Sequence, residues 1–245
     1  MTNNKLGFLN GNALKIIAAV LMFIDHMGML LFPGIRLFRI IGRLSMPIFA
    51  FMIAEGCKYT KNKLRYLLTI SVLALIYQIA YYIYDGSTYM CILVTFSLSI
   101  IMIYALNFFK EAFFSKETPI YTKVLAALLF LLSVAGTYIF TRFFRVDYTI
   151  YGCMLPVFAS LPHLPKSAPP VLKRLDCIPV SVITLGIGLF ILSYRLGGIQ
   201  MYSMLSLPLL FLYSGKRGKY KMKYFFYIFY PAHLLLLEAI ALLRY

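Results

Sequence analysis

The chain has 245 residues, of which 62% are hydrophobic and only 13% are charged, and its formal net charge is +16 at pH 7. A soluble domain of this length carries about 25% charged residues, so the composition excludes an ordinary soluble fold. The excess of Lys and Arg is typical of the cytoplasmic loops of membrane proteins. Because the chain has no soluble basic domain, nucleic acid is not an expected partner.

Apolar segments of roughly twenty residues recur along the whole chain, and each is long enough to cross a bilayer as a helix. The short alternating segments of a membrane barrel are absent, which leaves helices as the way to satisfy the backbone in lipid. We therefore expect an all-α, polytopic integral membrane helical bundle with about nine transmembrane helices (eight to ten) in a single transmembrane domain over residues 1–245. The expected spans cover residues 13–32, 40–57, 66–84, 90–109, 123–141, 149–163, 178–194, 199–214 and 224–243.

Basic residues predict the orientation of these spans. If the N-terminus is cytoplasmic, most of the Lys and Arg residues fall on the inner side of the membrane. The positively charged residues that remain on the outer side are then all arginines, a residue suited to bidentate ion pairs. This bias predicts a cytoplasmic N-terminus.

The first span contains three ionisable residues, Lys15, Asp25 and His26. Lys15 and His26 are eleven positions apart, which places them on one helix face, roughly 16 Å apart along the axis. Lys15 is expected at the inner interface, where it would meet a long anionic donor, and His26 deeper, where a neutral imidazole suits general base chemistry. Asp25 points about 100° away from His26 and is expected to pair with an arginine of the outer group.

The second span begins with Arg39 and Arg43 at its outer end, and these residues share a face if the segment is helical. They serve either in ion pairs or as interfacial residues whose charges reach the headgroups. Pro47 is expected to bend this span and to leave a carbonyl without its donor. Glu55, at the inner end, is expected to pair either with Lys15 or with a nearby lysine of the interface.

The sixth and eighth spans are marginal because both contain proline, at Pro156 and Pro208 respectively. Asp147 stands just before the sixth span and either neutralises a neighbouring arginine or helps to close the outer mouth of a cavity. His163 lies in the proline-rich loop that follows, and no role is assigned to it.

The ninth span carries His233, two residues after Pro231, and Glu238. His233 is expected near the middle of the bilayer, and Glu238 at the level of His26. Ionisable residues within spans are rare and mark functional sites. We therefore expect His233 to line the same site as His26, the other possibility being a hydrogen bond that packs two helices.

Several motifs resemble a known family. The matching runs are ALKIIAAVLMFIDHMG, IIGRLSMPIFAFMIAEG, DYTIYG, LYSGKRG and FYIFYPAHLLLL. Together they resemble the TraX family, whose namesake is a conjugal-transfer protein associated with N-acetylation of pilin, and the resemblance extends over nearly the whole chain. The resemblance implies a multi-pass protein of the bacterial cytoplasmic (inner) membrane.

The family is similar to integral membrane acyltransferases in which a basic residue, ten intervening residues and a histidine form a pattern that Lys15 and His26 fit. The resemblance thus implies an acyltransferase with acetyl-CoA or another acyl-CoA as donor, no metal, and His26 as the general base. The acceptor is an amine or hydroxyl on a protein N-terminus, a glycan or a small amine. Arg43 or a tyrosine would steady the oxyanion, and Asp25 or Glu238 would balance the imidazolium charge.

The candidate catalytic residues are His26, Asp25, Arg43 and His233. The candidate substrate-binding residues are Lys15, Arg39, Glu55, Asp147, Tyr151, Tyr230 and Glu238. The basic run Lys216–Lys223 is a further candidate for attracting the CoA phosphates.

Two other functions remain open at this stage. The first is a proton-coupled transporter or flippase, in which Asp25, His26, Glu55 and His233 form a path through the membrane. The absence of an internal repeat disfavours it. The second is a non-catalytic assembly factor whose buried charges hold helices together.

Overall fold

The computed structural model describes residues 7–220 and 222–244, and it confirms the all-α fold. Within these ranges there is no β-strand, and two isolated bridges join Leu9 to Tyr213 and Met90 to Val146. The helices are α1 (Gly11–Leu30), α2 (Arg36–Gly42), α3 (Ser45–Tyr59), α4 (Lys63–Asp85), α5 (Ile92–Phe114), α6 (Ile120–Phe143), α7 (Thr149–Ser160), α8 (Pro170–Lys173), α9 (Ile178–Leu196), the 3₁₀ helix η1 (Gly198–Leu205), α10 (Ser206–Phe211) and α11 (Lys223–Arg244).

In the described part of the chain, six helical segments are long and apolar enough to cross a membrane. They are Gly11–Leu30, Arg36–Tyr59, Lys63–Tyr84, Ile92–Phe114, Ile120–Phe143 and Ile178–Leu196. Shorter apolar helices cover Thr149–Ser160, Gly198–Phe211 and Ile228–Leu243. The structure therefore confirms a multi-helix membrane protein, while the total of nine spans and the cytoplasmic N-terminus stay predictions.

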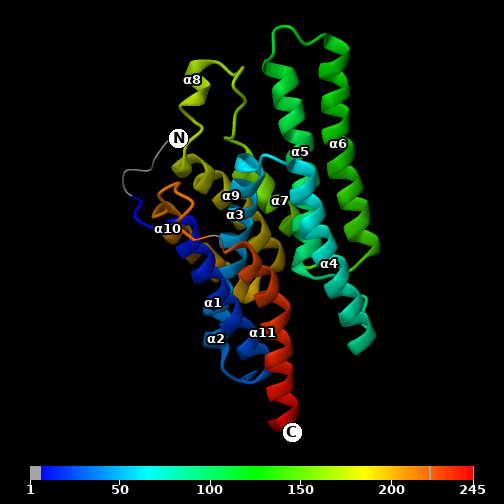
Figure 1. Cartoon of the computed structure of the whole chain (residues 1–245), viewed down its shortest axis with the longest axis vertical. Coiled ribbons are helices and arrows are strands. Elements are labelled where there is room, and N and C mark those ends of the chain that lie inside the picture. The colour runs from blue at the N-terminus through cyan, green and yellow to red at the C-terminus, as the bar shows by residue number, and fades with distance from the viewer. Residues whose placement is uncertain (1–6, 221, 245) are drawn as a thin grey trace. The chain divides into compact units, whose positions relative to one another are not determined.

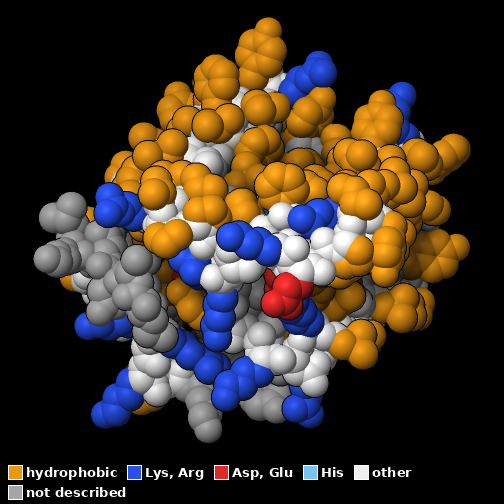
Figure 2. Space-filling view, turned by 90° about the horizontal axis from the view of Figure 1, so that it is seen from above, with side chains coloured by type: hydrophobic (Ala, Val, Ile, Leu, Met, Phe, Trp, Pro, Cys, Tyr) orange, Lys and Arg blue, Asp and Glu red, His pale blue; other side chains and the backbone are white. Residues whose placement is uncertain are grey.

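The surface agrees with a lipid environment. Leu131 and Leu132 of α6 are 60% and 65% exposed, although leucine is normally buried in a soluble protein. The face shown in Figure 2 is broadly hydrophobic, with Lys and Arg side chains gathered on part of it and few Asp or Glu side chains. Exposed apolar surface on this scale is stable when acyl chains rather than water cover it.

The described chain divides into two compact units, and the expectation of a single domain stays a prediction. The first unit comprises Met1–Met52 and Leu189–Tyr245, and the second comprises Ile53–Gly188. The boundaries fall inside α3 and α9. Each unit is described in turn.

In the first unit, α1 packs against α2 and α11 (Figure 1). The 3₁₀ helix η1 packs against α2 and α10. The Asn10 side chain begins α1 by accepting a hydrogen bond from the Ala13 N–H at 3.0 Å, which satisfies one of the free donors at the helix start. Small residues bring α2 close to α1, because a Cβ at Gly42 would overlap the side chain and Cα of Asp25. This close approach holds the functional part of α1 against α2.

The second predicted span, over residues 40–57, lies within the apolar segment Arg36–Tyr59, and a turn divides this segment into two helices where Pro47 was expected to bend it. Helix α2 ends at Gly42 and α3 begins at Ser45, with a turn between them. Pro47 explains the position of the break, because it has no N–H to donate to the carbonyl four residues earlier and its ring crowds that carbonyl. The carbonyl belongs to Arg43, so the proline places Arg43 at the turn.

The marginal eighth span is also divided. Gly197 and Gly198 have φ values of 66° and 57°, a region that glycine adopts without strain, and they end α9. The chain then forms η1, a 3₁₀ helix of 8 residues, and the short helix α10. A 3₁₀ run longer than about four residues is uncommon, and at membrane depth it is tolerated where protein surrounds it.

In the second unit, α5 packs against α4, α6 and α7. The sixth predicted span is α7, a helix of 12 residues that continues through Pro156. Its C-terminus is satisfied by Lys110 of α5, whose Nζ donates to the carbonyls of Ser160, Leu161 and His163 at 2.9, 2.9 and 3.1 Å. A cation bound to the last carbonyls of a helix also interacts favourably with the helix dipole.

Replacing Lys110 with methionine is expected to lower the free energy of unfolding by about 3 kcal/mol, because three carbonyls lose a charged donor. Thermal unfolding of the purified protein measures the change. Lys173 provides the control, because it donates to a backbone carbonyl at an exposed position, and Lys173→Met should leave the melting temperature nearly unchanged. Equal melting temperatures for the Lys110 variant and the wild type would contradict the assigned role.

Candidate functional site

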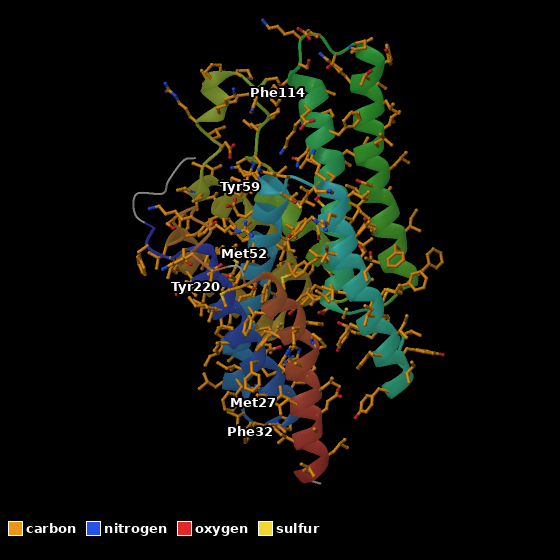
Figure 3. The ribbon with its side chains drawn as sticks, viewed as in Figure 1. Met27, Phe32, Met52, Tyr59, Phe114 and Tyr220 are labelled. Carbon is orange, nitrogen blue, oxygen red and sulfur yellow. The ribbon has the colours of Figure 1, made fainter. Side chains whose placement is uncertain are left out.

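The residues singled out in the first and ninth spans meet in the first unit, where the C-terminal half of α1 lies beside α2 and α11. Figure 3 marks this end of α1 by Met27, the residue that follows His26. Tyr220 marks the opposite end of the helix in the same view. Two groups of side chains make up the site, a pair of histidines and a carboxylate held by two arginines.

The two histidines form a direct pair. Nδ1 of His26 lies 2.9 Å from Nε2 of His233, and the ring centroids are 5.0 Å apart. His233 is 4% exposed, whereas His26 is only half-buried. His233 therefore meets His26 although the residues are 207 positions apart, and its place in a functional site stays a prediction, because a hydrogen bond that packs two helices has the same geometry.

The partners of His233 set the direction of the hydrogen bond between the rings. Nδ1 of His233 lies 2.7 Å from the carbonyl oxygen of Phe229, which can only accept, so this nitrogen carries a proton. In the neutral ring Nε2 is then an acceptor, and Nδ1 of His26 must be the donor. Consequently Nε2 of a neutral His26 carries a lone pair on the side of the ring that faces away from His233.

Aromatic rings fix the orientation of His233. Phe229 stacks on it with centroids 4.9 Å apart and planes 10° from parallel, and Tyr230 meets it edge-on at 5.9 Å. Phe23 of α1 lies on a further side, with its centroid 6.5 Å away. Tyr230, a predicted substrate-binding residue, is thus placed beside the histidine pair, where it helps to hold one ring.

Asp25 is held by two arginines of the outer group, Arg39 and Arg43, which confirms its expected pairing. Arg39 Nη1 lies 2.7 Å from Asp25 Oδ2, and Arg43 Nη2 lies 3.0 and 3.1 Å from the two carboxylate oxygens. Arg39 also donates to the Asp25 backbone carbonyl at 3.1 Å. The Asp25 carboxylate therefore binds α2 and the turn after it to α1, at the residue before His26. The His26 ring itself contacts His233.

The packing of α2 against Asp25 of α1 is most sensitive to a larger side chain at Gly42. Gly42→Ala is expected to lower the free energy of unfolding by about 1–3 kcal/mol, because the new methyl group would overlap Asp25 and push α2 away from α1. Gly136 of α6 is a matched control, since nothing lies within 4 Å of its Cβ position. Gly136→Ala should leave thermal stability unchanged or raise it by about 0.5–1 kcal/mol. Equal behaviour of the two variants would contradict the close packing.

At its other end, α1 meets a basic loop, which we define as residues 214–220. The Gly11 N–H donates to the Lys216 carbonyl at 2.8 Å, and Asn12 Nδ2 donates to the Tyr220 carbonyl at 2.8 Å. Lys15 lies close enough to Arg217 for the two charges to interact. Positive charge thus gathers at the N-terminus of α1, while the expected role of Lys15 and the run Lys216–Lys223 in attracting CoA phosphates stays a prediction; Lys221 and the Lys223 side chain lie outside the described residues.

Three of the predicted substrate-binding residues, Glu55, Asp147 and Tyr151, belong to the second unit. Asp147 Oδ1 accepts a hydrogen bond from the Tyr89 hydroxyl at 2.8 Å, and Tyr151 lies on α7. The remaining one, Glu238, lies half-buried on α11 of the first unit.

Glu55 has a partner that sequence reasoning missed. Its Oε1 lies 3.5 Å from Nε2 of His163, and both side chains are less than a tenth exposed. Burial lowers the pKa of His163, so its ring is neutral near pH 7. Lys58, the neighbouring lysine of the interface, pairs with Asp176. The helical periodicity of the sequence did not point to His163, because this residue lies in an irregular loop.

A family model described as "TraX protein" matches residues 10–241. The chain belongs to the TraX family. The probable fimbrial assembly protein FimC, serogroup H1, of Dichelobacter nodosus is 25% identical over 91% of this chain and 92% of its own length. The uncharacterized protein RP591 of Rickettsia prowazekii is 44% identical over 52 residues, and this match covers 21% of each chain. No solved structure matches the chain.

In this TraX-family chain, three of the motifs that carried the resemblance contribute to one site. The Asp25–His26 pair comes from α1, Arg43 from the turn after α2, and His233 from α11. Among the described residues, no group of three or more His, Cys, Asp or Glu is placed to hold a metal ion. What the arrangement offers chemically is an imidazole lone pair beside an anchored second imidazole, within an apolar unit.

Proposed function

We propose that this chain is an integral membrane acyltransferase, which moves an acetyl or other short acyl group from acyl-CoA to an amine or hydroxyl acceptor. The observation that carries the proposal is the contact between the two histidine rings, in which Nδ1 of His26 lies 2.9 Å from Nε2 of His233 while Nδ1 of His233 lies 2.7 Å from the Phe229 carbonyl. Because His26 donates through Nδ1, its Nε2 is available to take a proton. An imidazole in this state is the commonest general base near neutral pH.

In the proposed reaction, Nε2 of His26 takes the proton of the attacking amine or hydroxyl as the nucleophile bonds to the thioester carbonyl carbon. The imidazolium that forms is stabilised because its Nδ1–H already donates to His233. The tetrahedral intermediate then collapses and the carbon–sulfur bond breaks. His26 returns the proton to the departing CoA sulfur, so the products are CoA thiol and the acylated acceptor.

The basic end of α1 supports acyl-CoA as the donor. Lys15, Arg217 and the N-terminal end of the helix dipole bring positive charge together where CoA phosphates would bind. Lys15 and His26 are roughly 16 Å apart along one helix face. An extended pantetheine arm has a comparable length, so phosphates held at Lys15 would place the thioester near His26.

The acceptor tested first is the amino terminus of a fimbrial subunit. This choice rests on the printed name of the Dichelobacter nodosus relative, a probable fimbrial assembly protein. A glycan and a small amine are tested beside it, because His26 would deprotonate any of the three nucleophiles.

Acetyl-CoA is expected to raise the melting temperature of the purified protein by about 5–10 °C at 100 times its Kd, since a ligand of the native state stabilises it. His26→Ala should keep this shift and lose transfer of radiolabelled acetyl groups, while Lys15→Ala should weaken the shift. Lys173→Met serves as the matched lysine control. The absence of any shift across acyl chain lengths would reject acyl-CoA and favour transport through Asp25, His26, Glu55 and His233.

A further inference from the structure

Gln200 of η1 is a buried amide without a partner for its nitrogen. The residue is 4% exposed, and its Nε2 has no hydrogen-bond partner among the described residues. The backbone of Gln200 is satisfied, since its N–H donates to the Gly197 carbonyl at 3.2 Å and its carbonyl accepts from Ser193 Oγ at 3.2 Å. Only the side-chain donor is left, and buried donors in native proteins have partners.

The surroundings of Gln200 are polar although the segment lies in an apolar membrane protein. Ser193, Ser203 and Ser206 are each 0% exposed, and the hydroxyls of Ser193 and Ser203 lie 3.3 Å apart. The backbone here is the 3₁₀ helix that follows Gly197 and Gly198. In membrane proteins, irregular backbone that is buried in protein or lines a cavity is typical of ligand sites, because its free polar groups can face a substrate rather than lipid.

Gln200 lies on η1, in the same unit as the histidine pair. Helix η1 packs against α2, and Arg39 of α2 binds Asp25, the residue before His26. All of these elements belong to the first unit. The Gln200 amide therefore offers, within this unit, an N–H donor that no side chain of the described fold uses.

We propose that Nε2 of Gln200 donates a hydrogen bond to the carbonyl oxygen of the acyl group being transferred. The inference rests on the proposed acyltransferase function and adds a substrate-binding residue to it. As the nucleophile adds, the carbonyl π electrons move onto this oxygen, and the amide N–H stabilises the negative charge that develops. When the carbon–sulfur bond breaks, the electrons return to the carbonyl and the charge leaves with the sulfur, which takes the proton from His26.

Gln200→Leu tests the proposal because it removes the donor and keeps the approximate shape. We expect kcat for acetyl transfer to fall about 100-fold, with acetyl-CoA binding within twofold of wild type. We also expect the melting temperature to rise by about 2–5 °C, since an unpaired buried donor has been removed. Gln200→Met, another apolar variant of similar length, is the second variant if the leucine substitution prevents folding.

Gln78 is the matched control, because its amide makes the hydrogen bonds that Gln200 lacks. Its Nε2 donates to the Tyr89 carbonyl at 3.0 Å, so Gln78→Leu should lower the melting temperature. If the Gln200 variants keep wild-type kcat, or lower the melting temperature as the Gln78 variant does, the proposal is wrong and the amide is structural. If wild type itself transfers no acyl group, the proposed function fails instead, and the two failures are thereby distinguished.

Discussion

Replacing His26 with asparagine is expected to lower kcat for acyl transfer by about 10²–10⁴-fold while the protein still folds. Asparagine Nδ2 can take the place of the histidine Nδ1 and donate to His233, so the contact between α1 and α11 is kept. The lone pair of Nε2 is lost, and with it the base. Single-turnover transfer of radiolabelled acetyl groups measures the rate, and the melting temperature reports folding.

Variants of His233 test whether His26 acts as a base alone or with His233 as its hydrogen-bond partner. His233→Gln retains an acceptor for the His26 N–H and should keep more activity than His233→Leu, which has none. Because the two rings act together, His26→Asn with His233→Leu should be hardly slower than His26→Asn alone. Additive losses, or full activity in His26→Asn, would show that the histidine pair does not supply the base.

Replacing Asp25 with asparagine is expected to lower the free energy of unfolding by about 3–5 kcal/mol, the largest effect on stability that we predict. The side chains of Asp25 and Arg43 are 14% and 13% exposed, so water has little access to this ion pair. The substitution therefore leaves the charges of Arg39 and Arg43 poorly hydrated and without their negative partner. Thermal unfolding in detergent or in nanodiscs measures the loss. Activity should fall with it, because α2 is no longer fastened next to His26.

Removing a positive charge together with the carboxylate distinguishes this explanation from a simple loss of packing. Asp25→Asn combined with Arg39→Gln should be more stable than Asp25→Asn alone, since fewer uncompensated charges remain. If the double variant is less stable than Asp25→Asn, or if Asp25→Asn unfolds at the wild-type temperature, the ion pairs do not hold α2.

Much of the fold could be predicted because a bilayer permits few solutions. Composition and the length of the apolar segments led to an all-α membrane protein, and six helical segments of the described chain are long and apolar enough to be spans. The break near Arg43 was missed, although Pro47 was expected to bend the span. Hydropathy averages over about twenty residues, so it does not resolve a two-residue turn inside an apolar segment.

The candidate site was found in part. Asp25, His26, Arg43 and His233 stood out because ionisable groups are costly in apolar segments. Gln200 and His163 did not, because an uncharged amide has no such signal and a loop has no helical period. Both residues became notable only when their burial and their partners were known.

The sequence by itself determined the class of protein, the residue types in each span and the family, since these depend on composition, local period and motif. Only the tertiary structure decided which of those residues meet. It paired His26 with a ring 207 positions away, and the Phe229 carbonyl determined which nitrogen of that ring carries the proton. The physical reason is that helix packing and hydrogen-bond direction depend on the contacts between helices, which the period along one helix does not specify.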